Sequence, residues 1–527
     1  MIKENKKFEE VVPNKDFVER SKCRYCKFWK EGVCPYPNRH AENGEGTCPE
    51  FTEANDVELK ERELNLKVEV KKDILKRLRH DVYQGLLIKD RAGATEEIVK
   101  QIKKDNWIYT TKDDIKSEMW IYQEGIYKPN GKSYVKEYCR IVLEKAYTIN
   151  LANDVLGKIE ADTYIKQEDF FDNKYVDEIP VINGILNTKT RELGEFDPKK
   201  IFFNKLPVTY DSNATCEHID QFIGDILAKE EDKTVAYELI GQGLFKEYFT
   251  EKAGMLVGNG RNGKSKFLEL IKRLVGVENT CSVPLRAMKE DNSSLCELHG
   301  RLFNLAGDLS NTDLKDTGCF KQTVGRDLLQ AHRKFLRDLI FVNYSKHIFA
   351  CNELPRVYDT TDGFWTKWVL LEFPYKFVSK KEMEAVPEEL RGKLKIKDPE
   401  IIEKITTDSE LSGLLNLALD GLDRLFKNKN FSQTKGTMEI KDFWIRNSDS
   451  FAAFCIDCVE EDYDTCISKK EMRKRYSRYC KGHKVKGAGD KAIKVTLEDR
   501  YGVIDSKKNV NDEWVWVWEG IKFKSNL

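Results

Sequence analysis

A glycine-rich loop near the middle of the chain constrains its fold more than any other feature of the sequence. Residues 258–265 read Gly-Asn-Gly-Arg-Asn-Gly-Lys-Ser and match the phosphate-loop pattern G-x-x-x-x-G-K-S. The apolar run 253–257 precedes the loop, and an amphipathic segment that extends to Leu274 follows it. The predicted order of strand, loop and helix is the order that this pattern needs, and it indicates a nucleotide-binding α/β domain.

Each residue type in the loop has a chemical role. Lys264 would neutralise charge on the β- and γ-phosphates, and Ser265 would ligate Mg²⁺. The other candidate phosphate-binding residues are Gly258, Asn259, Gly260, Arg261, Asn262 and Gly263, whose backbone N–H groups would wrap the anion. A structural glycine-rich turn is the alternative interpretation. ATP is favoured over GTP because no N-K-x-D-like base-reading sequence follows.

Two further apolar runs, residues 302–306 and 346–351, alternate with helical segments and predict parallel strands beside the first. Asp308 follows one run and is the candidate acid that holds the water shell of Mg²⁺. Asn352 follows the other run and would orient the attacking water. Leu309 occupies the adjacent position where a water-activating carboxylate is expected, so the sequence lacks that group there.

These motifs, taken in chain order, resemble those of superfamily 3 helicases. The similarity is to the phage and plasmid branch related to the poxvirus primase-helicase, and it rests on residues 258–265, 302–310, 320–335 and 350–374. Residues 120–130, 179–190 and 204–211 also resemble the domain that precedes the ATPase in that branch. The resemblance implies an ATP-driven hexameric ring that translocates on single-stranded DNA, with Lys264, Ser265, Asp308 and Asn352 at the nucleotide.

The same resemblance implies a pore hairpin within residues 320–335 that grips DNA phosphates. Lys334 is the expected tip residue, Arg333 lies beside it, and Lys321 is a further candidate. A solvated charged helix is the alternative interpretation of this segment.

One departure from the resemblance concerns the arginine finger. Where relatives have a pair of arginines, this chain has Lys367 preceded by Thr366. A lysine is only a point charge, whereas an arginine spreads transition-state charge through a planar fork. Lys367 or Arg356 would take the role, and the sequence does not choose between them.

Four cysteines cluster near the start of the chain, at Cys23, Cys26, Cys34 and Cys48. Four thiolates at this spacing predict a tetrahedral Zn²⁺ site, which would hold a small segment folded. An iron–sulfur cluster is the alternative because aromatic residues surround the cysteines. Cys455 and Cys458, by contrast, lie in an apolar helical stretch and are predicted to pack in a core.

The C-terminal region carries a strong local charge. Residues 468–487 contain nine lysines and arginines and one glutamate, which gives a local net charge of +8. Arg473, Lys474 and Arg478 are the candidate DNA contacts there, and a solvated helix face is the alternative. Residues 514–518 alternate Trp and Val, which predicts a strand with its tryptophans on one face. Such tryptophans more often belong to a sheet core than to a stacking platform.

The predicted fold class is α/β and multidomain, with an AAA+-like P-loop ATPase core built on a parallel sheet. Residues 401–426 predict one amphipathic helix that would serve as a lid or bridge. The expected domains are a cysteine-rich metal-binding element at 1–52, a charged helical arm at 53–105, an α/β collar domain at 106–245, the superfamily 3 ATPase at 246–435, and a winged-helix-like DNA-binding domain at 436–527.

Composition limits where the chain acts and what it contacts. Lys and Arg number 89 and Asp and Glu also number 89, so the net charge is 0 and DNA contacts must come from local basic faces. No signal peptide and no membrane-length apolar run is expected, which predicts a cytoplasmic protein, in the host cytoplasm if the replicon is viral.

The predicted function is that of a replicative DNA helicase of a virus, phage or plasmid-type element. Expected ligands and partners are ATP, Mg²⁺, Zn²⁺, single-stranded DNA in a channel, duplex DNA at the C-terminal domain, further copies of the chain, and a primase or replication initiator. Barely 100 residues precede Trp107, so a component of a primase-helicase without its own primase domain is one alternative. An ATP-gated DNA-binding assembly factor with weak hydrolysis is the other.

Overall fold

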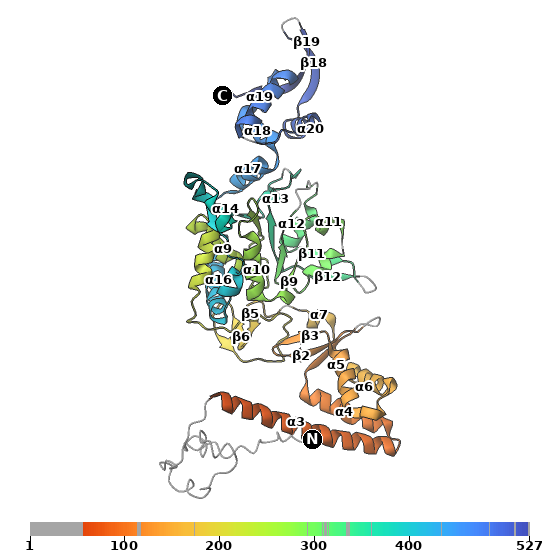
Figure 1. The fold of residues 1–527 in the computed structure, drawn as a ribbon. Coiled ribbons are helices and arrows are strands. Elements are labelled where there is room, and N and C mark those ends of the chain that lie inside the picture. Colours follow the sequence, from red (N-terminus) through yellow and green to blue (C-terminus); the bar gives the residue numbers. More distant parts are fainter. Residues whose placement is uncertain are drawn as a thin grey trace. The chain divides into compact units, whose positions relative to one another are not determined.

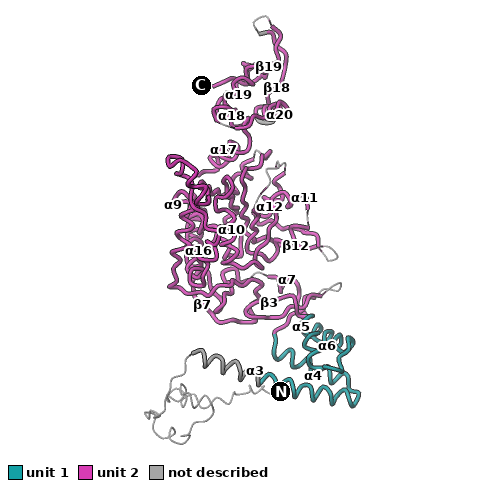
Figure 2. The backbone as a smooth tube through the Cα atoms, viewed as in Figure 1, with its two compact units in different colours: residues 1–106, 132–162 teal, residues 107–131, 163–527 magenta. Residues whose placement is uncertain are grey.

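The computed structural model describes residues 56–112, 117–172, 174–291, 293–307, 309, 314, 316–333, 338–359, 361–433, 435–483, 485–510 and 513–524. The chain divides into two compact units, coloured separately in Figure 2. The first comprises residues 1–106 and 132–162, and the second comprises residues 107–131 and 163–527. Figure 1 shows the elements of each unit along the chain.

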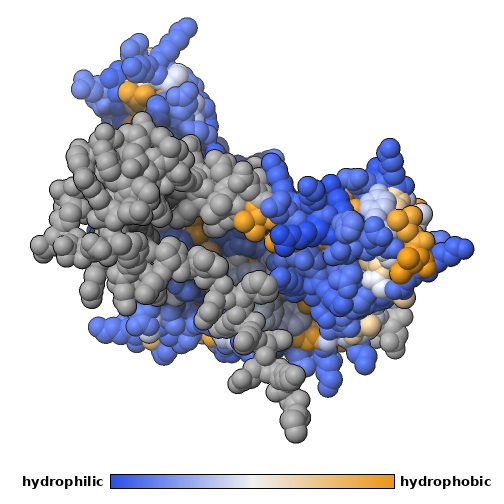
Figure 3. Space-filling model, turned by 90° about the horizontal axis from the view of Figure 1, so that it is seen from below, coloured by the Kyte–Doolittle hydropathy of each residue, from blue (hydrophilic) through white to orange (hydrophobic). Residues whose placement is uncertain are grey.

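The described surface is mostly polar. The face shown in Figure 3 is predominantly hydrophilic with small, separate apolar patches, as expected from a chain in which 34% of residues are charged. Among the helices that the structure describes, none combines the length and the apolar character that crossing a bilayer requires.

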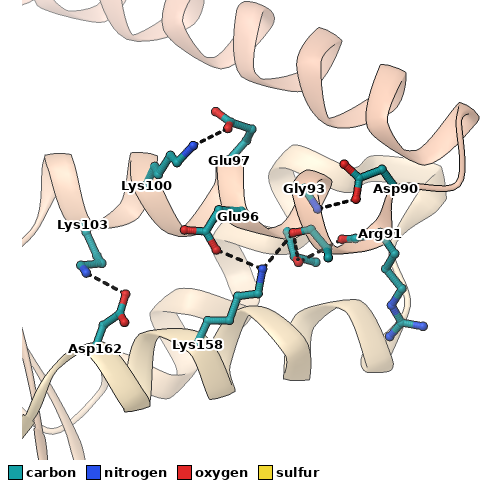
Figure 4. Close-up of polar contacts among 11 residues, drawn as sticks. Asp90, Arg91, Gly93, Glu96, Glu97, Lys100, Lys103, Lys158 and Asp162 are labelled. Atoms are coloured by element: carbon teal, nitrogen blue, oxygen red, sulfur yellow. Dashed lines mark hydrogen bonds and ion pairs between the residues drawn. The ribbon is translucent and has the colours of Figure 1, made fainter.

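The first unit is helical. Its elements are α3 (Asp56–Leu87), α4 (Arg91–Asp105), α5 (Gly131–Leu143, of which Gly131 belongs to the second unit), a 3₁₀ turn (Glu144–Ala146) and α6 (Ile149–Asp162). Asp90 caps α4 by accepting from the Gly93 N–H, and ion pairs such as Lys103–Asp162 (2.7 Å) join α4 to α6 (Figure 4). These exposed pairs each contribute at most about 1 kcal/mol, so buried apolar residues of α4 such as Ile98 and Ile102 hold the unit together. The charged stretch predicted as an arm therefore folds with α5 and α6.

The second unit begins with two small sheets. One has the order β3-β2-β1-β4, formed by Ile126–Lys128, Met119–Gln123, Ile108–Thr111 and Tyr164–Ile165. The other has the order β5-β6-β7, formed by Glu178–Val181, Gly184–Asn187 and Leu193–Gly194. The β2–β3 and β5–β6 pairs are antiparallel hairpins. Helices α7 (Gln167–Phe170), α8 (Glu217–Ile226) and α9 (Glu230–Gln242) lead to the central sheet.

The central sheet has five parallel strands in the order β14-β8-β13-β10-β9. They are Trp368–Glu372, Ala253–Val257, Lys346–Cys351, Phe303–Ala306 and Thr280–Cys281. The three strands predicted from apolar runs are confirmed, with β10 beginning one residue later than expected. The mixed α/β class, the parallel sheet and the multidomain organisation are as predicted.

Both faces of the central sheet are buried, which explains why its strands read as continuous apolar runs. Leu256, Leu305 and Ile348 point into one core, which also contains residues of α9, α10 (Lys264–Val275) and α16 (Asp408–Asn428). Met255 and Phe349 belong to the second core on the other side. Because the sheet is fixed from both sides, the loops at its carboxyl edge rest on a rigid base.

The predicted single helix at 401–426 is wrong. The segment forms α15 (Ile401–Ile405) and α16, which are separated at Thr406 and Thr407. The Thr407 hydroxyl accepts from the Glu410 N–H and starts a new helix, with Asp408 in its first turn. Helix α16 is also no lid, since it packs against α9: a Cβ at Gly421 would lie 2.5 Å from the Tyr237 carbonyl oxygen.

The C-terminal region combines helices with an antiparallel sheet of order β17-β19-β18 (Figure 1). Its elements are α17 (Thr437–Ser448), α18 (Ser450–Cys458), β17 (Val459–Ser468), α19 (Lys469–His483), α20 (Asp490–Tyr501), β18 (Ile504–Val510) and β19 (Glu513–Phe523). Cys455 is fully buried and Cys458 packs at the edge of the same core, which confirms the predicted packing role.

The remaining elements are short and lie between the strands of the second unit. They are 3₁₀ turns at Val277–Asn279, Ser294–Leu298 and Glu388–Lys393, helices α11 (Ala287–Glu290), α12 (Gly318–Val324), α13 (Asp362–Trp365) and α14 (Lys380–Glu384), and strands β11 (Leu328–Ala331), β12 (Leu339–Val342), β15 (Lys376–Val378) and β16 (Leu394–Ile396).

Candidate nucleotide-binding site

The glycine-rich loop leaves the carboxyl edge of the central sheet between β8 and α10. Val257 is in register with Cys351 of β13, so Gly258 and Asn352 follow paired residues of neighbouring strands. A Cβ at Gly258 would lie 2.5 Å from the Phe373 carbonyl oxygen and still closer to Asn262 Nδ2, so only glycine fits there. Gly263, with φ +94°, turns the chain into the first residue of α10. The loop therefore presents the N-terminus of α10, where anions bind favourably.

Lys264 and Asn352 are brought together by this loop. The buried Lys264 Nζ donates to the Gly258 carbonyl (2.6 Å), to Asn262 Oδ1 (3.1 Å) and to Asn352 Oδ1 (3.0 Å). Asn352 Oδ1 also accepts from the Gly260 N–H at 3.1 Å. All of these acceptors are neutral oxygens, and a phosphate would replace them with stronger charge-assisted hydrogen bonds.

A cavity of about 610 Å³ opens beside the loop. Residues 260–266 and Asn352 line it. Side chains from three other segments also line it and form its apolar wall, namely Phe222 and Ile226 of α8, Phe377 and Ile396 of β15 and β16, and Ile401 and Ile405 of α15. A cavity that combines phosphate-binding groups with aliphatic and aromatic side chains suits a nucleotide.

The sequence did not reveal the apolar wall, because its residues come from segments about 150 positions apart and have no motif. Two ion pairs link these segments. Arg261 pairs with Glu382 of α14 at 2.8 Å, and Lys395 pairs with Asp225 of α8 at 2.8 Å. The hydrogen bond from Arg261 is the main cause that lowers the pKa of Glu382 to about 2. The Arg261 side chain thus links the loop to α14, and the Arg261 carbonyl accepts from the Phe377 N–H at 2.7 Å.

The predicted Mg²⁺ ligands are only partly described. Ser265 lies in the first turn of α10 and lines the cavity. Asp308 lies outside the described residues, two positions after the end of β10. The Leu309 N–H donates to the Ala350 carbonyl at 2.9 Å, and its side chain packs against the second core. An apolar contact therefore occupies the position where the sequence lacks a carboxylate.

Lys367 is not at the loop of its own chain. It lies just before β14, at the amino edge of the sheet, roughly 16 Å along the strands from the loop. Its ammonium group pairs with Glu251 and its side chain is 18% exposed. The other candidate, Arg356, donates to the Ser448 carbonyl and pairs with Asp449 at 3.7 Å. None of these contacts of Lys367 and Arg356 involves the glycine-rich loop.

The predicted DNA-binding residues lie on two elements. Strands β11 and β12 form an antiparallel hairpin, and Arg333 follows β11 and pairs with Glu118 at 3.7 Å. Lys334 lies outside the described residues, and Lys321 of α12 pairs with Asp359 at 2.9 Å. In the C-terminal region Arg473, Lys474 and Arg478 are all exposed on α19, and Arg473 pairs with Asp490 at 2.6 Å.

The predicted zinc ligands Cys23, Cys26, Cys34 and Cys48 lie outside the described residues. Within the part of the chain that the structure describes, no group of three His, Cys, Asp or Glu side chains is placed to hold a metal ion. Asn259, the remaining loop residue of the prediction, is exposed and does not line the cavity.

Comparison with known proteins finds two matching families and a relative that is named as a helicase. A family described as "D5 N terminal like" matches residues 72–228, and a family of unknown function, DUF5906, matches residues 256–364. A protein of Acanthamoeba polyphaga mimivirus named as a helicase, L207/L206, is 26% identical over 179 residues. This chain is a relative of the viral and phage superfamily 3 helicases. The resemblance predicted from the motifs is thereby confirmed.

The match to the mimivirus protein covers 33% of this chain and 18% of the mimivirus protein. Among solved structures, the apo C-terminal region of NrS-1 is 12% identical, with a TM-score of 0.40, over 80% of this chain and 98% of that one. The JCV helicase bound to a small molecule is 14% identical, with a TM-score of 0.26, over 67% of this chain and 86% of that one.

Proposed function

We propose that this protein is an ATP-dependent DNA helicase that acts in the replication of a virus, phage or plasmid-type element. The observation that carries the proposal is the meeting of the glycine-rich loop, Lys264 and Asn352 at the carboxyl edge of a parallel sheet. In this proposal the central sheet and its helices are an AAA+-like P-loop core, and several copies assemble into a ring around single-stranded DNA.

In this proposal ATP would lie in the cavity beside the glycine-rich loop. The phosphates would contact the loop N–H groups and Lys264, and the adenine would pack between Phe222 of α8 and Phe377 of β15. Ser265 and Asp308 are the residues that would hold Mg²⁺, which neutralises negative charge on the phosphate oxygens when bound. Asn352 would orient the attacking water, because its amide already faces the end of the Lys264 side chain.

DNA would contact the chain at two places. The loop of the β11–β12 hairpin, with Arg333 and Lys334, would follow the phosphates of a single strand in the ring channel. The C-terminal helices and the β18–β19 hairpin have the element order of a winged helix, and Arg473, Lys474 and Arg478 would contact duplex phosphates. A separate primase or initiator, and zinc at the four N-terminal cysteines, remain parts of the proposal.

A second candidate function follows from two specific positions. Leu309 supplies packing in place of a water-activating carboxylate, and Lys367 is neutralised by Glu251. Both features favour slow hydrolysis of ATP. Slow hydrolysis would be sufficient for an assembly factor that uses ATP binding to form a ring on DNA.

The test compares wild type with two lysine variants of the same helix. Lys264→Ala should lower ATP turnover by about a hundredfold or more and abolish unwinding of a forked duplex. Lys272→Ala, which removes the same charge about 12 Å further along α10, should leave both within twofold of wild type. Wild-type rings that bind ATP but neither separate the fork nor hydrolyse ATP faster with DNA would refute the helicase and support the assembly factor.

A further inference from the structure

Two large aromatic side chains are exposed on the β18–β19 hairpin. Trp514 is 68% exposed and Trp516 is 51% exposed, whereas Trp518 is 4% exposed and belongs to the C-terminal core. The expectation that these tryptophans form sheet core is therefore wrong for two of the three. The reason is that β17 pairs with β19 only from Val517 onward, so residues 513–516 pair with β18 alone.

The two exposed tryptophans share one face of the hairpin. Trp516 is paired with Lys507 of β18, and Trp514 is paired with Asn509, so these four side chains point to the same side. We call them the tryptophan face. Residues two positions apart on a strand are separated by about 6.8 Å, which leaves room for each ring to accept a separate flat group.

The tryptophan face continues into a positively charged groove. The groove has a volume of about 330 Å³, and its charged lining residues are Lys469, Arg473, Lys491 and Lys494 with Asp490. Lys469 Nζ lies 5.0 Å from the ring centroid of Trp516 and 4.3 Å from that of Trp518, and Lys507 Nζ lies 5.9 Å from the ring of Trp516. Asp505 pairs with Lys469 and Lys494, Asp490 pairs with Arg473, and Glu498 pairs with Lys494, so five cations face three carboxylates across the groove and the face.

We propose that the tryptophan face and its groove bind single-stranded nucleic acid. Unpaired bases would stack on Trp514 and Trp516, and the phosphates would follow Lys507 and Lys469. A duplex does not fit this chemistry, because its bases are already stacked on one another and hidden from an aromatic side chain. An apolar protein partner fits less well, because lysines are depleted at the centre of protein interfaces.

This site shares Arg473 with the duplex contacts proposed on α19 but adds Trp514 and Trp516 of the β18–β19 hairpin, and it needs no ATP. It deepens the proposed function, because an unwinding ring produces unpaired strands near its ends. The site would hold such a strand by its bases, whereas the hairpin of the ring channel would hold a strand by its phosphates.

The experiment measures binding to the full chain without nucleotide. Fluorescence anisotropy would compare a labelled dT12 strand with a twelve-residue abasic strand, which has the same phosphates but no bases. Wild type should prefer dT12, and the double variant Trp514→Ala/Trp516→Ala should lose about tenfold or more in affinity for dT12 but little for the abasic strand. Trp107→Ala, which removes a tryptophan that is 46% exposed elsewhere, is the matched control and should change neither.

Two further arms decide what the loss means. The double variant Trp514→Phe/Trp516→Phe should keep most of the wild-type affinity for dT12, since stacking needs an aromatic ring and not an indole N–H. An rU12 strand should bind within a few-fold of dT12 if the bases carry the contact. Unchanged dT12 binding by the double Ala variant, or equal losses for both strands, would overturn the proposal. Absence of unwinding by wild type would refute the helicase alone, because this binding is measured without ATP.

Discussion

Replacing Gly258 by alanine tests the geometry of the glycine-rich loop directly. The added Cβ would lie 2.5 Å from the Phe373 carbonyl oxygen, whereas Cβ contacts under 3.0 Å essentially never occur. The carbonyl would have to move by at least half an ångström. Phe373 cannot yield freely, because its own N–H donates to the Val257 carbonyl at 2.8 Å and fixes it to the end of β8.

The size of the effect follows from how this strain can be relieved. The Cβ would also contact Asn262 Nδ2, and Asn262 is buried and accepts from Lys264. Relief therefore requires either opening the end of the β8–β14 pair or moving the residue that positions Lys264. Overpacking of this kind costs about 1–3 kcal/mol. If the loop conformation that binds phosphate bears that cost, the Kd for ATP rises about 5- to 150-fold.

Isothermal titration with ATP would measure this change, and thermal unfolding would show whether the fold persists. The matched control is Gly224→Ala on α8, in a wall of the same cavity, where an added Cβ meets nothing within 4 Å. That variant should bind ATP as wild type does, and its free energy of unfolding should rise by about 0.5–1 kcal/mol, since alanine is the better helix residue. ATP binding by Gly258→Ala as tight as that of wild type would refute the described loop geometry.

Three further predictions follow from the described contacts. Phe377→Ala should raise the Kd for ATP roughly tenfold through loss of apolar contact, with turnover at saturating ATP within threefold; an unchanged Kd would exclude Phe377 from the base site. Burial lowers the pKa of Lys246 and of Lys346 to about 7, so the folded state binds fewer protons than the unfolded chain between pH 7 and about 10. The free energy of unfolding in urea should therefore rise over that range by up to about 1.4 kcal/mol per pH unit for each lysine, and Lys346→Met should flatten the rise. Trp444→Ala should cost about 3–5 kcal/mol in denaturant titrations, because the side chain is fully buried and donates to the Pro355 carbonyl, and a loss under 1 kcal/mol would contradict this packing.

The parts of the site that could be predicted are those encoded locally. Strands β8 and β13 were located to the residue, because buried parallel strands read as uninterrupted apolar runs. The loop and Asn352 follow such runs directly, and parallel strands bring their carboxyl ends to one edge. The apolar wall of the cavity could not be predicted, because Phe222 and Phe377 meet only through tertiary packing.

Two wrong expectations had different causes. The break between α15 and α16 was readable, because Thr407 and Glu410 fit the T-x-x-E signature of a helix start; the apolar period that runs past them from Ile405 to Leu411 masked it. The exposure of Trp514 and Trp516 was not readable. Alternation assigns side chains to one face of a strand, but whether that face is covered depends on how far the neighbouring strand β17 extends.

Strand β13 connects the candidate nucleotide-binding site to the β11–β12 hairpin. All six of its residues are buried, and its carboxyl end leads into Asn352, which contacts both Lys264 and Gly260. Three residues separate its amino end from β12, the second strand of the β11–β12 hairpin. A ligand that draws Lys264 toward a phosphate would take away its hydrogen bond to Asn352 at the carboxyl end of this strand. The candidate nucleotide-binding site and the hairpin are close along the chain because only one short strand, which spans the sheet, separates them.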